Sequence, residues 1–341
     1  MPDNTLAVAL ALITSLALVW GLRPVARWVG LVDRPDGELK DHSREIPIVG
    51  GISVFLGLHI AMEVGGIFDV WLFGITLAML VVGVVDDIVG ISPLLRLLAE
   101  GGAGVVMGLG VGSRSDVMSL VVIVAFVVVA INAVNLLDGA DGLAGSAAFV
   151  SAIGLAFLAR TFGTGVWGPL VLAGAIAGFL VFNWPPAQVF LGDGGAYVVG
   201  VALAFFAVSL GGEPAIAGSD WLPITVIAGS TLGVFLVDLV VTLLRRVVSR
   251  APLFGGDRSH VYDQLALAGH TPKRVVAMVA GAQVSIVTLV VAFAHWFEPW
   301  VAAVSGVSLI VVSIIALSLL GFATGRAGHE AREAPELTVG E

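Results

Sequence analysis

The chain has 341 residues, of which 58% are hydrophobic and 12% charged; its net charge is −9 and it contains no cysteine. Soluble domains are usually about 45–50% apolar and about 25% charged. The composition therefore excludes a soluble globular protein, a disordered chain and a nucleic-acid-binding protein with a basic face. It also excludes disulfides and a cysteine nucleophile. The class that remains is an all-α, polytopic integral membrane protein.

Continuous apolar runs of about 20 residues, the length that crosses a bilayer as a helix, predict about eleven transmembrane helices. These runs lie near residues 5–22, 47–66, 69–85, 93–112, 117–135, 142–159, 167–183, 196–211, 222–243, 274–295 and 300–321. Because the runs do not alternate with polar residues, they argue against a β-barrel. We expect a single transmembrane domain over residues 1–324 and a short polar tail over 325–341.

The basic residues are distributed unequally between the predicted loops. Fourteen of the sixteen Lys and Arg residues fall on one side, and only Arg114 and Arg160 on the other. The positive-inside rule then predicts a multi-pass protein of the plasma (inner) membrane, with the N-terminus outside and the tail in the cytoplasm. The chemistry is expected on the cytoplasmic side, in the segments 23–46, 86–96, 132–145, 183–195 and 244–273.

The first of these segments mixes acidic and basic residues between Asp33 and Arg44. At a lipid interface, side chains such as Lys40 and Arg44 are suited to a headgroup phosphate. The alternative is a basic anchor for the first helix.

Two adjacent carboxylates, Asp86 and Asp87, end the third apolar run. Ionisable groups at a membrane edge are costly and tend to be functional. Neighbours on a helix point about 100° apart, so different roles are expected for the pair, such as metal ligation by one and phosphate positioning or proton acceptance by the other. A solvated helix end is the alternative.

The segment from Asn132 to Leu143 carries Asn135, Asp138 and Asp141. The two acids are three residues apart and share a face if the segment is helical, while Gly139 allows a ligand to approach the backbone. A turn between two spans is the alternative, but two Asp-Gly pairs exceed what a turn needs.

Asp193 is surrounded by glycines just before an apolar run, and an acid without a local cation needs a metal or a distant base; glycines used for helix packing are the alternative. The last long loop contains Arg258 and His260, and Asp238 in the preceding span is expected to face a cavity. An incidental histidine is the alternative there.

Five acids, Asp86, Asp87, Asp138, Asp141 and Asp193, are thus predicted on one membrane face beside basic loops. Carboxylates and phosphate oxygens are preferred Mg²⁺ ligands, and Mg²⁺ neutralises the charge of a diphosphate. The pattern predicts a Mg²⁺–diphosphate site whose second substrate is a lipid.

These motifs resemble those of a known family, the polyprenyl-phosphate N-acetylhexosamine-1-phosphate transferases (glycosyltransferase 4 type, MraY/WecA-like), and most closely its WecA-like branch. The resemblance covers nearly the whole chain. It is carried by Asp86-Asp87, by N-x-x-N-x-x-D-G-x-D-G-L-A from Asn132, by F-x-G-D-x-G from Phe190, and by D-R-P…K-x-H…P-x-x-G-G from Asp33.

The resemblance implies a Mg²⁺-dependent enzyme, with Mn²⁺ as a potential substitute. The implied reaction moves a sugar-1-phosphate, such as N-acetylhexosamine-1-phosphate, from a UDP-sugar to polyprenyl phosphate. The products are polyprenyl-diphosphate-sugar and UMP, in the first membrane step of a cell-envelope glycan or glycoconjugate pathway. The implied partners are the two substrates and the bilayer, not a nucleic acid, and a homodimer stays open.

The resemblance also implies roles for individual residues. These are catalysis for Asp86, Asp87 and His260; metal ligation for Asp193 and Asp87; nucleotide binding for Asn135, Asp138, Gly139, Asp141, Asn183 and Phe190; and phosphate binding for Lys40, His42, Arg44, Arg96 and Arg258. One motif departs from the family pattern, because Tyr262 and Asp263 replace two histidines of D-R-x-H-x-H-H. The identity of the sugar therefore stays open.

Two further alternatives remain at the level of sequence. Direct attack by the lipid phosphate is favoured because such a monoester is largely ionised near pH 7, but a covalent intermediate on Asp86 is the other route. An ion-coupled secondary transporter is the rival function, since Glu100 and Asp238 lie within predicted spans.

Overall fold

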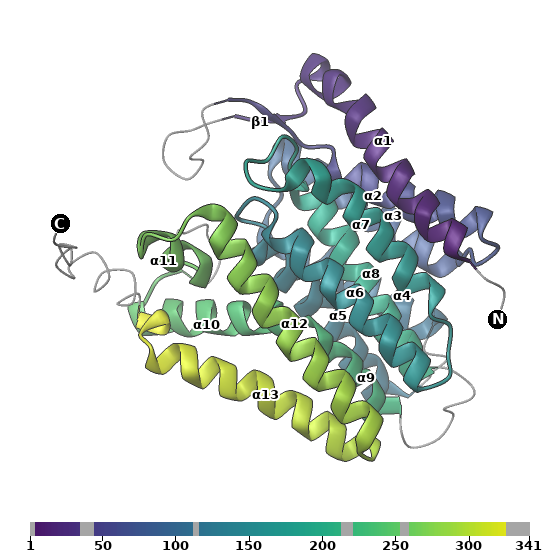
Figure 1. Ribbon diagram of the computed structural model, residues 1–341, viewed down its shortest axis with the longest axis vertical. Helices are drawn as coiled ribbons and strands as arrows, with labels where there is room; N and C mark the ends of the chain where they lie inside the picture. The colour runs from purple at the N-terminus through teal and green to yellow at the C-terminus, as the bar shows by residue number, and fades with distance from the viewer. Residues whose placement is uncertain (1–3, 35–43, 112–115, 213–220, 253–258, 325–341) are drawn as a thin grey trace, which may run out of the picture.

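The computed structural model describes residues 4–34, 44–111, 116–212, 221–252 and 259–324. Within these ranges the protein is a bundle of helices with one very short sheet (Figure 1). The helices are α1 (Thr5–Val29), α2 (Gly50–Val64), α3 (Val70–Val89), α4 (Pro93–Gly110), α5 (Val117–Leu137), α6 (Leu143–Thr161), α7 (Trp167–Asn183), α8 (Gly192–Gly212), α9 (Trp221–Gly229), η2 (Ser230–Leu232), α10 (Gly233–Ser249), α11 (Val261–Leu267), α12 (Pro272–Trp296), α13 (Pro299–Leu319) and η3 (Phe322–Thr324).

The sheet consists of two strands near the amino-proximal loop. Strands β1 (Val32–Asp33) and β2 (Ile46–Pro47) pair antiparallel, with Val32 opposite Pro47. The all-α expectation is therefore confirmed for the described chain apart from these four residues.

Polar residues at the ends of the apolar runs set where several helices begin. The side chain of Asp69 accepts the backbone N–H groups of Trp71 and Leu72 at the start of α3. Ser92 caps α4, which has Pro93 at its first position, and Asp116 caps α5. These residue types satisfy backbone donors that a helix leaves unpaired at its N-terminus.

Eight helical segments of the described chain are long and apolar enough to cross a membrane: α1, α3, α5, α6, α8, the continuous stretch from α9 to α10, α12 and α13. This confirms a polytopic membrane protein. Helices α2 and α7 are shorter, with 15 and 17 residues, and α4 carries Arg96 and Glu100. The count of eleven spans therefore stays a prediction, although each of the eleven apolar runs coincides with helical structure.

The run predicted near 222–243 differs from the structure in two ways. Its helix breaks into a 3₁₀ turn at η2 and then continues to Ser249. A buried glutamine of α12 compensates the break: Gln283 donates to the carbonyl of Thr231 at 2.6 Å and accepts the N–H of Val234 at 2.9 Å. Backbone groups inside a bilayer need partners of this kind, and no local hydropathy pattern predicts a partner on another helix.

Helix α8 forms the centre of the bundle. It is buried along nearly its whole length and packs against α2, α3, α5 and α9. An all-round apolar helix is suited to such a position. Its close approach to α3 depends on two glycines, since a Cβ on Gly83 would lie 2.4 Å from the Cα of Gly194.

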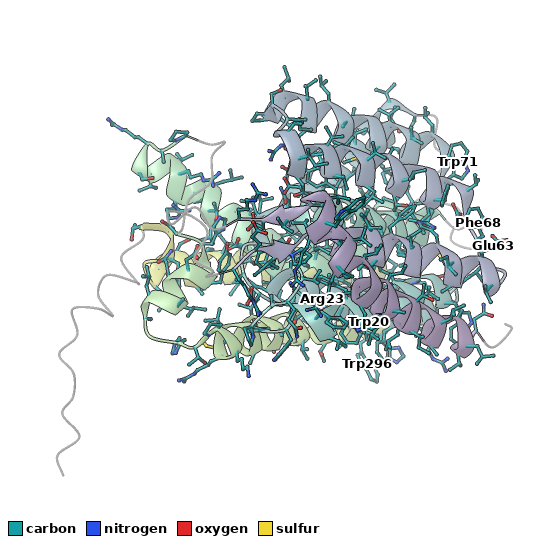
Figure 2. All side chains as sticks on the ribbon, turned by 90° about the horizontal axis from the view of Figure 1, so that it is seen from above. Trp20, Arg23, Glu63, Phe68, Trp71 and Trp296 are labelled. Atoms are coloured by element: carbon teal, nitrogen blue, oxygen red, sulfur yellow. The ribbon has the colours of Figure 1, made fainter. Side chains whose placement is uncertain are left out.

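The outer surface is apolar and carries tryptophans. Trp20, Trp71 and Trp296 are exposed, and Figure 2 shows their side chains at the periphery of the bundle. Such side chains are enriched where a protein meets lipid and its headgroups. One turn after Trp20 on α1, the guanidinium of Arg23 lies 5.3 Å from the centroid of the Phe182 ring.

Successive long helices run between two ends of the bundle, and the start of α1 and the end of α13 lie at opposite ends (Figure 1). The described parts of the five motif segments meet at the end that carries β1 and α11. Among the described Lys and Arg residues, only Arg160 belongs to the other end. The unequal distribution of basic residues is thus a property of the fold, while its orientation in the membrane stays a prediction.

Candidate active site

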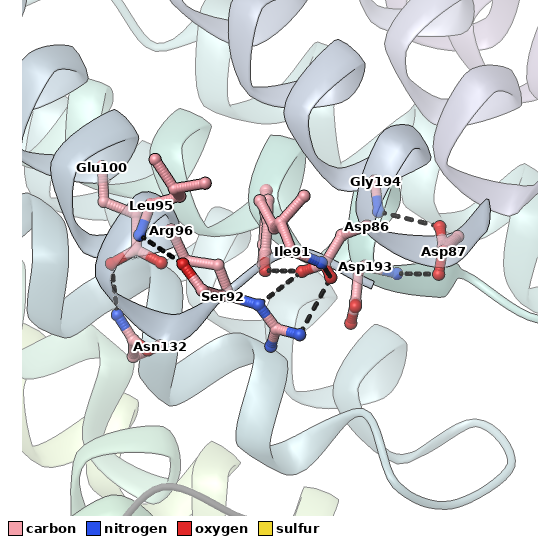
Figure 3. Close-up of polar contacts among 11 residues, drawn as sticks. Asp86, Asp87, Ile91, Ser92, Leu95, Arg96, Glu100, Asn132, Asp193 and Gly194 are labelled. Atoms are coloured by element: carbon pink, nitrogen blue, oxygen red, sulfur yellow. Dashed lines mark hydrogen bonds and ion pairs between the residues drawn. The ribbon is translucent and has the colours of Figure 1, made fainter. Parts of the chain in front are cut away.

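Asp86 is a buried carboxylate in the last turn of α3, and it is held by several donors. The guanidinium of Arg96 contacts both of its oxygens, at 2.6 Å from Nε to Oδ2 and 2.9 Å from Nη2 to Oδ1. The hydroxyl of Tyr197 donates to Oδ2 at 2.8 Å, and the backbone N–H of Ile91 donates to Oδ1 at 2.9 Å. Figure 3 shows the two-point contact with Arg96. Asp86 therefore joins α3, α4 and α8 through a neutralised, hydrogen-bonded charge.

Asp87 caps a different helix from its own. Its two carboxylate oxygens accept the backbone N–H groups of Asp193 at 3.0 Å and Gly194 at 3.2 Å, at the start of α8 (Figure 3). A carboxylate at a helix N-terminus satisfies unpaired donors and interacts favourably with the helix dipole. Gly192 is required beside it, because its φ is +76° and a Cβ there would lie 2.8 Å from Asp87 Oδ2. Asp87 therefore sets the position of Asp193.

Asp193 is partly exposed at the first turn of α8. Its carboxyl interacts electrostatically with those of Asp86 and Asp87 and with Arg96. In Figure 3 its carboxylate is directed away from Asp87, whereas its backbone N–H points toward Asp87. The side chain is thus partly accessible to solvent beside Asp86 and Asp87.

Asp138 ends α5, and its N–H donates to the carbonyls of Val134 and Asn135, both at 3.2 Å. Desolvation, followed by the negative charges of Asp193, Asp87 and Asp141, raises the pKa of Asp138 well above its ordinary value. The charges that raise this pKa belong to α8 (Asp193), α3 (Asp87) and the α5–α6 turn (Asp141). A carboxyl with a raised pKa among other acids is stabilised by a nearby cation.

The α5–α6 turn is fastened to the connection between α7 and α8. The amide oxygen of the buried Asn183 accepts the N–H of Gly142 at 2.9 Å, and its Nδ2 donates to the carbonyl of Val189 at 2.9 Å. Asp141 Oδ2 accepts the N–H of Ala187 at 2.8 Å. Asn183 and Asp141 therefore hold the turn in place, and their predicted contact with a nucleotide stays a prediction.

The amino-proximal segment is fixed to the same connection. Arg44 Nη2 donates to the carbonyl of Ala187 at 3.4 Å. Phe190 donates its N–H to the carbonyl of Pro47 at 2.9 Å and accepts the N–H of Gly50 at 3.0 Å. Segments that are more than 130 residues apart in sequence thus meet at Phe190.

The carboxy-proximal part of the site centres on His260, which is buried. Its Nδ1 lies 2.9 Å from Asp238 Oδ2 and 3.1 Å from Thr242 Oγ1, both on α10. The backbone N–H of Val261 reaches the other oxygen of Asp238 at 3.3 Å. Asp238 therefore orients His260. The sequence predicted only that Asp238 faces a cavity.

The structure brings most of the predicted residues to one end of the bundle. Asn135 lies one turn before Asp138 on α5, and Gly139 follows Asp138 in the turn. Three predicted phosphate ligands, Lys40, His42 and Arg258, lie outside the described residues.

Several residues of the site were missed by the sequence prediction. Tyr197 bonds Asp86, Thr242 contacts His260, and Tyr262 stacks on His260. Thr242 has no sequence signal. The two tyrosines are marked by rarity, since the chain contains two and both lie in the site, and Tyr262 is also marked by its departure from the family motif.

The donor set fits a magnesium ion that is shared with a substrate. Among the described residues, no group of three His, Asp or Glu side chains is arranged to hold a metal. Mg²⁺ is usually bound by one or two carboxylates, several waters and substrate phosphates rather than by an all-protein cage. A partly exposed Asp193 beside other acids suits that mode.

Comparison with known proteins places the chain in a family. The glycosyl transferase family 4 model matches residues 70–211, which include Asp86, Asp87, Asp138, Asp141 and Asp193. An undecaprenyl-phosphate alpha-N-acetylglucosaminyl 1-phosphate transferase of Haemophilus influenzae is 31% identical, with 76% of this chain and 78% of that protein aligned. The chain belongs to glycosyl transferase family 4.

Other similar proteins carry related names. The Escherichia coli K12 enzyme with the same name as the Haemophilus protein is 28% identical, over 96% of this chain and 93% of its own. A probable undecaprenyl-phosphate N-acetylglucosaminyl 1-phosphate transferase of Bacillus subtilis is 25% identical, over 82% and 83%. The family resemblance drawn from the motifs is confirmed, and this family 4 protein is a transferase.

Proposed function

We propose that this family 4 transferase moves a sugar-1-phosphate, with N-acetylglucosamine-1-phosphate as the first candidate, from a UDP-sugar to polyprenyl phosphate. The products are a polyprenyl-diphosphate-sugar and UMP, formed at the cytoplasmic face of the plasma membrane. The observation that carries the proposal is the meeting of Asp86, Asp87 and Asp193 beside Arg96 at one end of the spanning helices (Figure 3). The names of the relatives support the lipid acceptor and the sugar.

The acids of the site are proposed to hold Mg²⁺. Asp193 is the expected direct ligand, with Asp87 beside it and Asp138 among the neighbouring acids. When bound, Mg²⁺ supplies positive charge to the diphosphate and its leaving group. Asp87 has a further role here, since its bonds to the α8 N-terminus orient Asp193.

Arg96 is proposed to bind the acceptor phosphate. Its side chain is partly exposed, while Asp86 fixes the guanidinium from the buried side. Guanidinium groups of this kind bind phosphate with defined geometry. The polyprenyl chain then extends into the bilayer, because Arg96 lies at the end of helices with lipid-facing apolar surfaces.

The contacts of Asp86 favour direct transfer over a covalent enzyme intermediate. Both of its oxygens accept hydrogen bonds, and its charge is paired with Arg96. Such a carboxylate is a poor nucleophile. We therefore propose that an oxygen of the lipid phosphate bonds to the phosphorus that bears the sugar. The bond from that phosphorus to the bridging oxygen breaks, and UMP leaves with this oxygen.

The acids that favoured a transporter have partners in the structure. Glu100 accepts a hydrogen bond from Asn132, and Asp238 bonds His260. Neither is therefore left as an isolated intramembrane charge for ion coupling. Family membership likewise favours the transferase.

A reconstitution assay tests the proposal. The purified full chain is incubated with radiolabelled UDP-N-acetylglucosamine, polyprenyl phosphate and Mg²⁺, and both lipid-linked label and UMP are measured. We expect equal amounts of the two products and no product after chelation of Mg²⁺. Product with another UDP-sugar alone would overturn the choice of sugar. No product with any UDP-sugar would overturn the proposed reaction.

The variant Asp193→Asn is expected to lose activity by more than about 100-fold, as for a directly involved charged group. Asp69→Asn is the matched control, because Asp69 caps the far end of α3 and asparagine also caps helices. Full Mg²⁺-dependent activity of Asp193→Asn would refute the metal assignment.

A further inference from the structure

Tyr262 lies close to Gly139, and the backbone conformation at position 139 does not require a glycine. Gly142 of the same turn has a φ of +72°, in the region that favours glycine, but Gly139 does not adopt such a φ. Its backbone would therefore accept alanine. The obstacle is Tyr262, since a Cβ on Gly139 would lie 1.8 Å from the phenolic oxygen and 2.9 Å from Cζ. The tyrosine occupies the space of a side chain at position 139.

The same tyrosine also contacts the buried histidine. The rings of Tyr262 and His260 are stacked, with centroids 5.3 Å apart and an interplanar angle of 13°. His260 is in turn bonded to Asp238 at 2.9 Å. A line of contacts therefore runs from α10 through His260 and Tyr262 to Gly139, the residue after Asp138. Tyrosine suits this place because its ring is rigid and has only two rotatable bonds.

We propose that Tyr262 is a positioning residue for the transfer reaction, which sets the distance between His260 and the α5–α6 turn by packing against Gly139. This inference rests on the proposed function, because the reaction that Tyr262 serves is the sugar-1-phosphate transfer. Gly139 is then glycine because it receives Tyr262. The two residues form a matched pair although they are more than 120 residues apart in the sequence.

The steric half of the proposal is tested by a mutant cycle on positions 139 and 262. Gly139→Ala overpacks the contact and displaces Tyr262, so the Tm in detergent should fall and kcat should fall about tenfold. Adding Tyr262→Phe removes the nearest atom and should recover both values at least in part. Gly281→Ala is the control, because a Cβ there meets nothing within 4 Å. Unchanged kcat and Tm in Gly139→Ala, or no recovery of either value in the double variant, would overturn the pairing of Tyr262 with Gly139.

The functional half is tested on His260. Tyr262→Leu removes the stacked ring, so it should lower kcat in the wild type but cause no further loss in a His260→Ala background. Tyr262→Leu should also increase the rate at which diethyl pyrocarbonate modifies His260. This rate is measured by mass spectrometry, with the exposed His295 as the internal reference. Losses that multiply in full, or an unchanged labelling rate, would show that Tyr262 does not act through His260.

The two proposals fail in different ways. If the wild-type protein transfers no sugar-1-phosphate from any UDP-sugar, the proposed function is wrong. The Tm cycle and the labelling of His260 need no turnover, and they still decide whether Tyr262 joins Gly139 to His260.

Discussion

At the scale of single residues, neighbouring acids have separate structural tasks. Asp86 is neutralised by Arg96 and bonded by Tyr197, whereas Asp87 caps α8. The functional roles that the sequence predicts for the pair, metal ligation and phosphate positioning, stay predictions. The particular partners could not be predicted, because Tyr197 and Asp193 are more than 100 residues away and reach the acids only through the packing of α3 on α8.

The ion pair of Asp86 and Arg96 gives a first prediction. Arg96→Met leaves a buried carboxylate without its cation, which typically costs 3–5 kcal/mol; because Arg96 is about one-third exposed, about 3 kcal/mol is expected. Denaturant unfolding in detergent measures this loss. The double variant Asp86→Asn/Arg96→Met should regain part of it, and a double variant as unstable as the single one would contradict this account.

The acidic cluster gives a second prediction that does not depend on turnover. Binding of Mg²⁺ to the folded state alone stabilises the protein by mass action. We therefore expect the Tm to rise with Mg²⁺ concentration, and this rise to be lost in Asp193→Asn but kept in Asp69→Asn. An equal rise in both variants would place the ion elsewhere.

At the scale of elements, the break at η2 depends on one buried side chain. Gln283→Leu removes bonds to the carbonyl of Thr231 and the N–H of Val234, and unsatisfied buried groups typically cost 1–3 kcal/mol each. We expect a lower Tm. Ser285→Ala on the same helix serves as control, since its exposed hydroxyl bonds to the carbonyl of Gly281, one turn earlier on the same helix. Equal Tm values for the two variants would contradict the proposed compensation.

The elements show how far sequence carries the interpretation. Long apolar runs predict the helices. Because each helix crosses the bundle once, the connections between successive helices alternate between its two ends, and this alternation predicts that the motif segments meet at one end. The local sequence pattern does not predict the helix interruption at Ser230–Leu232 or the hydrogen bond between His260 and Asp238. Both depend on a partner in another element, and a periodicity or a motif spacing does not specify which helices touch.

At the scale of the whole molecule, orientation can be measured directly. The chain has no cysteine, so single cysteines can be introduced without background. With intact cells, a membrane-impermeant maleimide should label Arg160→Cys, at the end opposite the site. It should label Lys273→Cys, at the start of α12, only after permeabilisation. The reverse pattern would invert the predicted topology.

Because Asp87 of α3 caps α8, a change in length has a different effect at each end of the bundle. Each helical residue adds about 1.5 Å along the axis and about 100° of rotation. One residue inserted between Gly83 and Asp87 would turn the carboxylate away from the N–H groups of Asp193 and Gly194. One residue inserted into the α6–α7 connection, at the opposite end, leaves this alignment untouched. Variation in length among proteins built in this way should therefore accumulate at the end of the bundle that is remote from the acids.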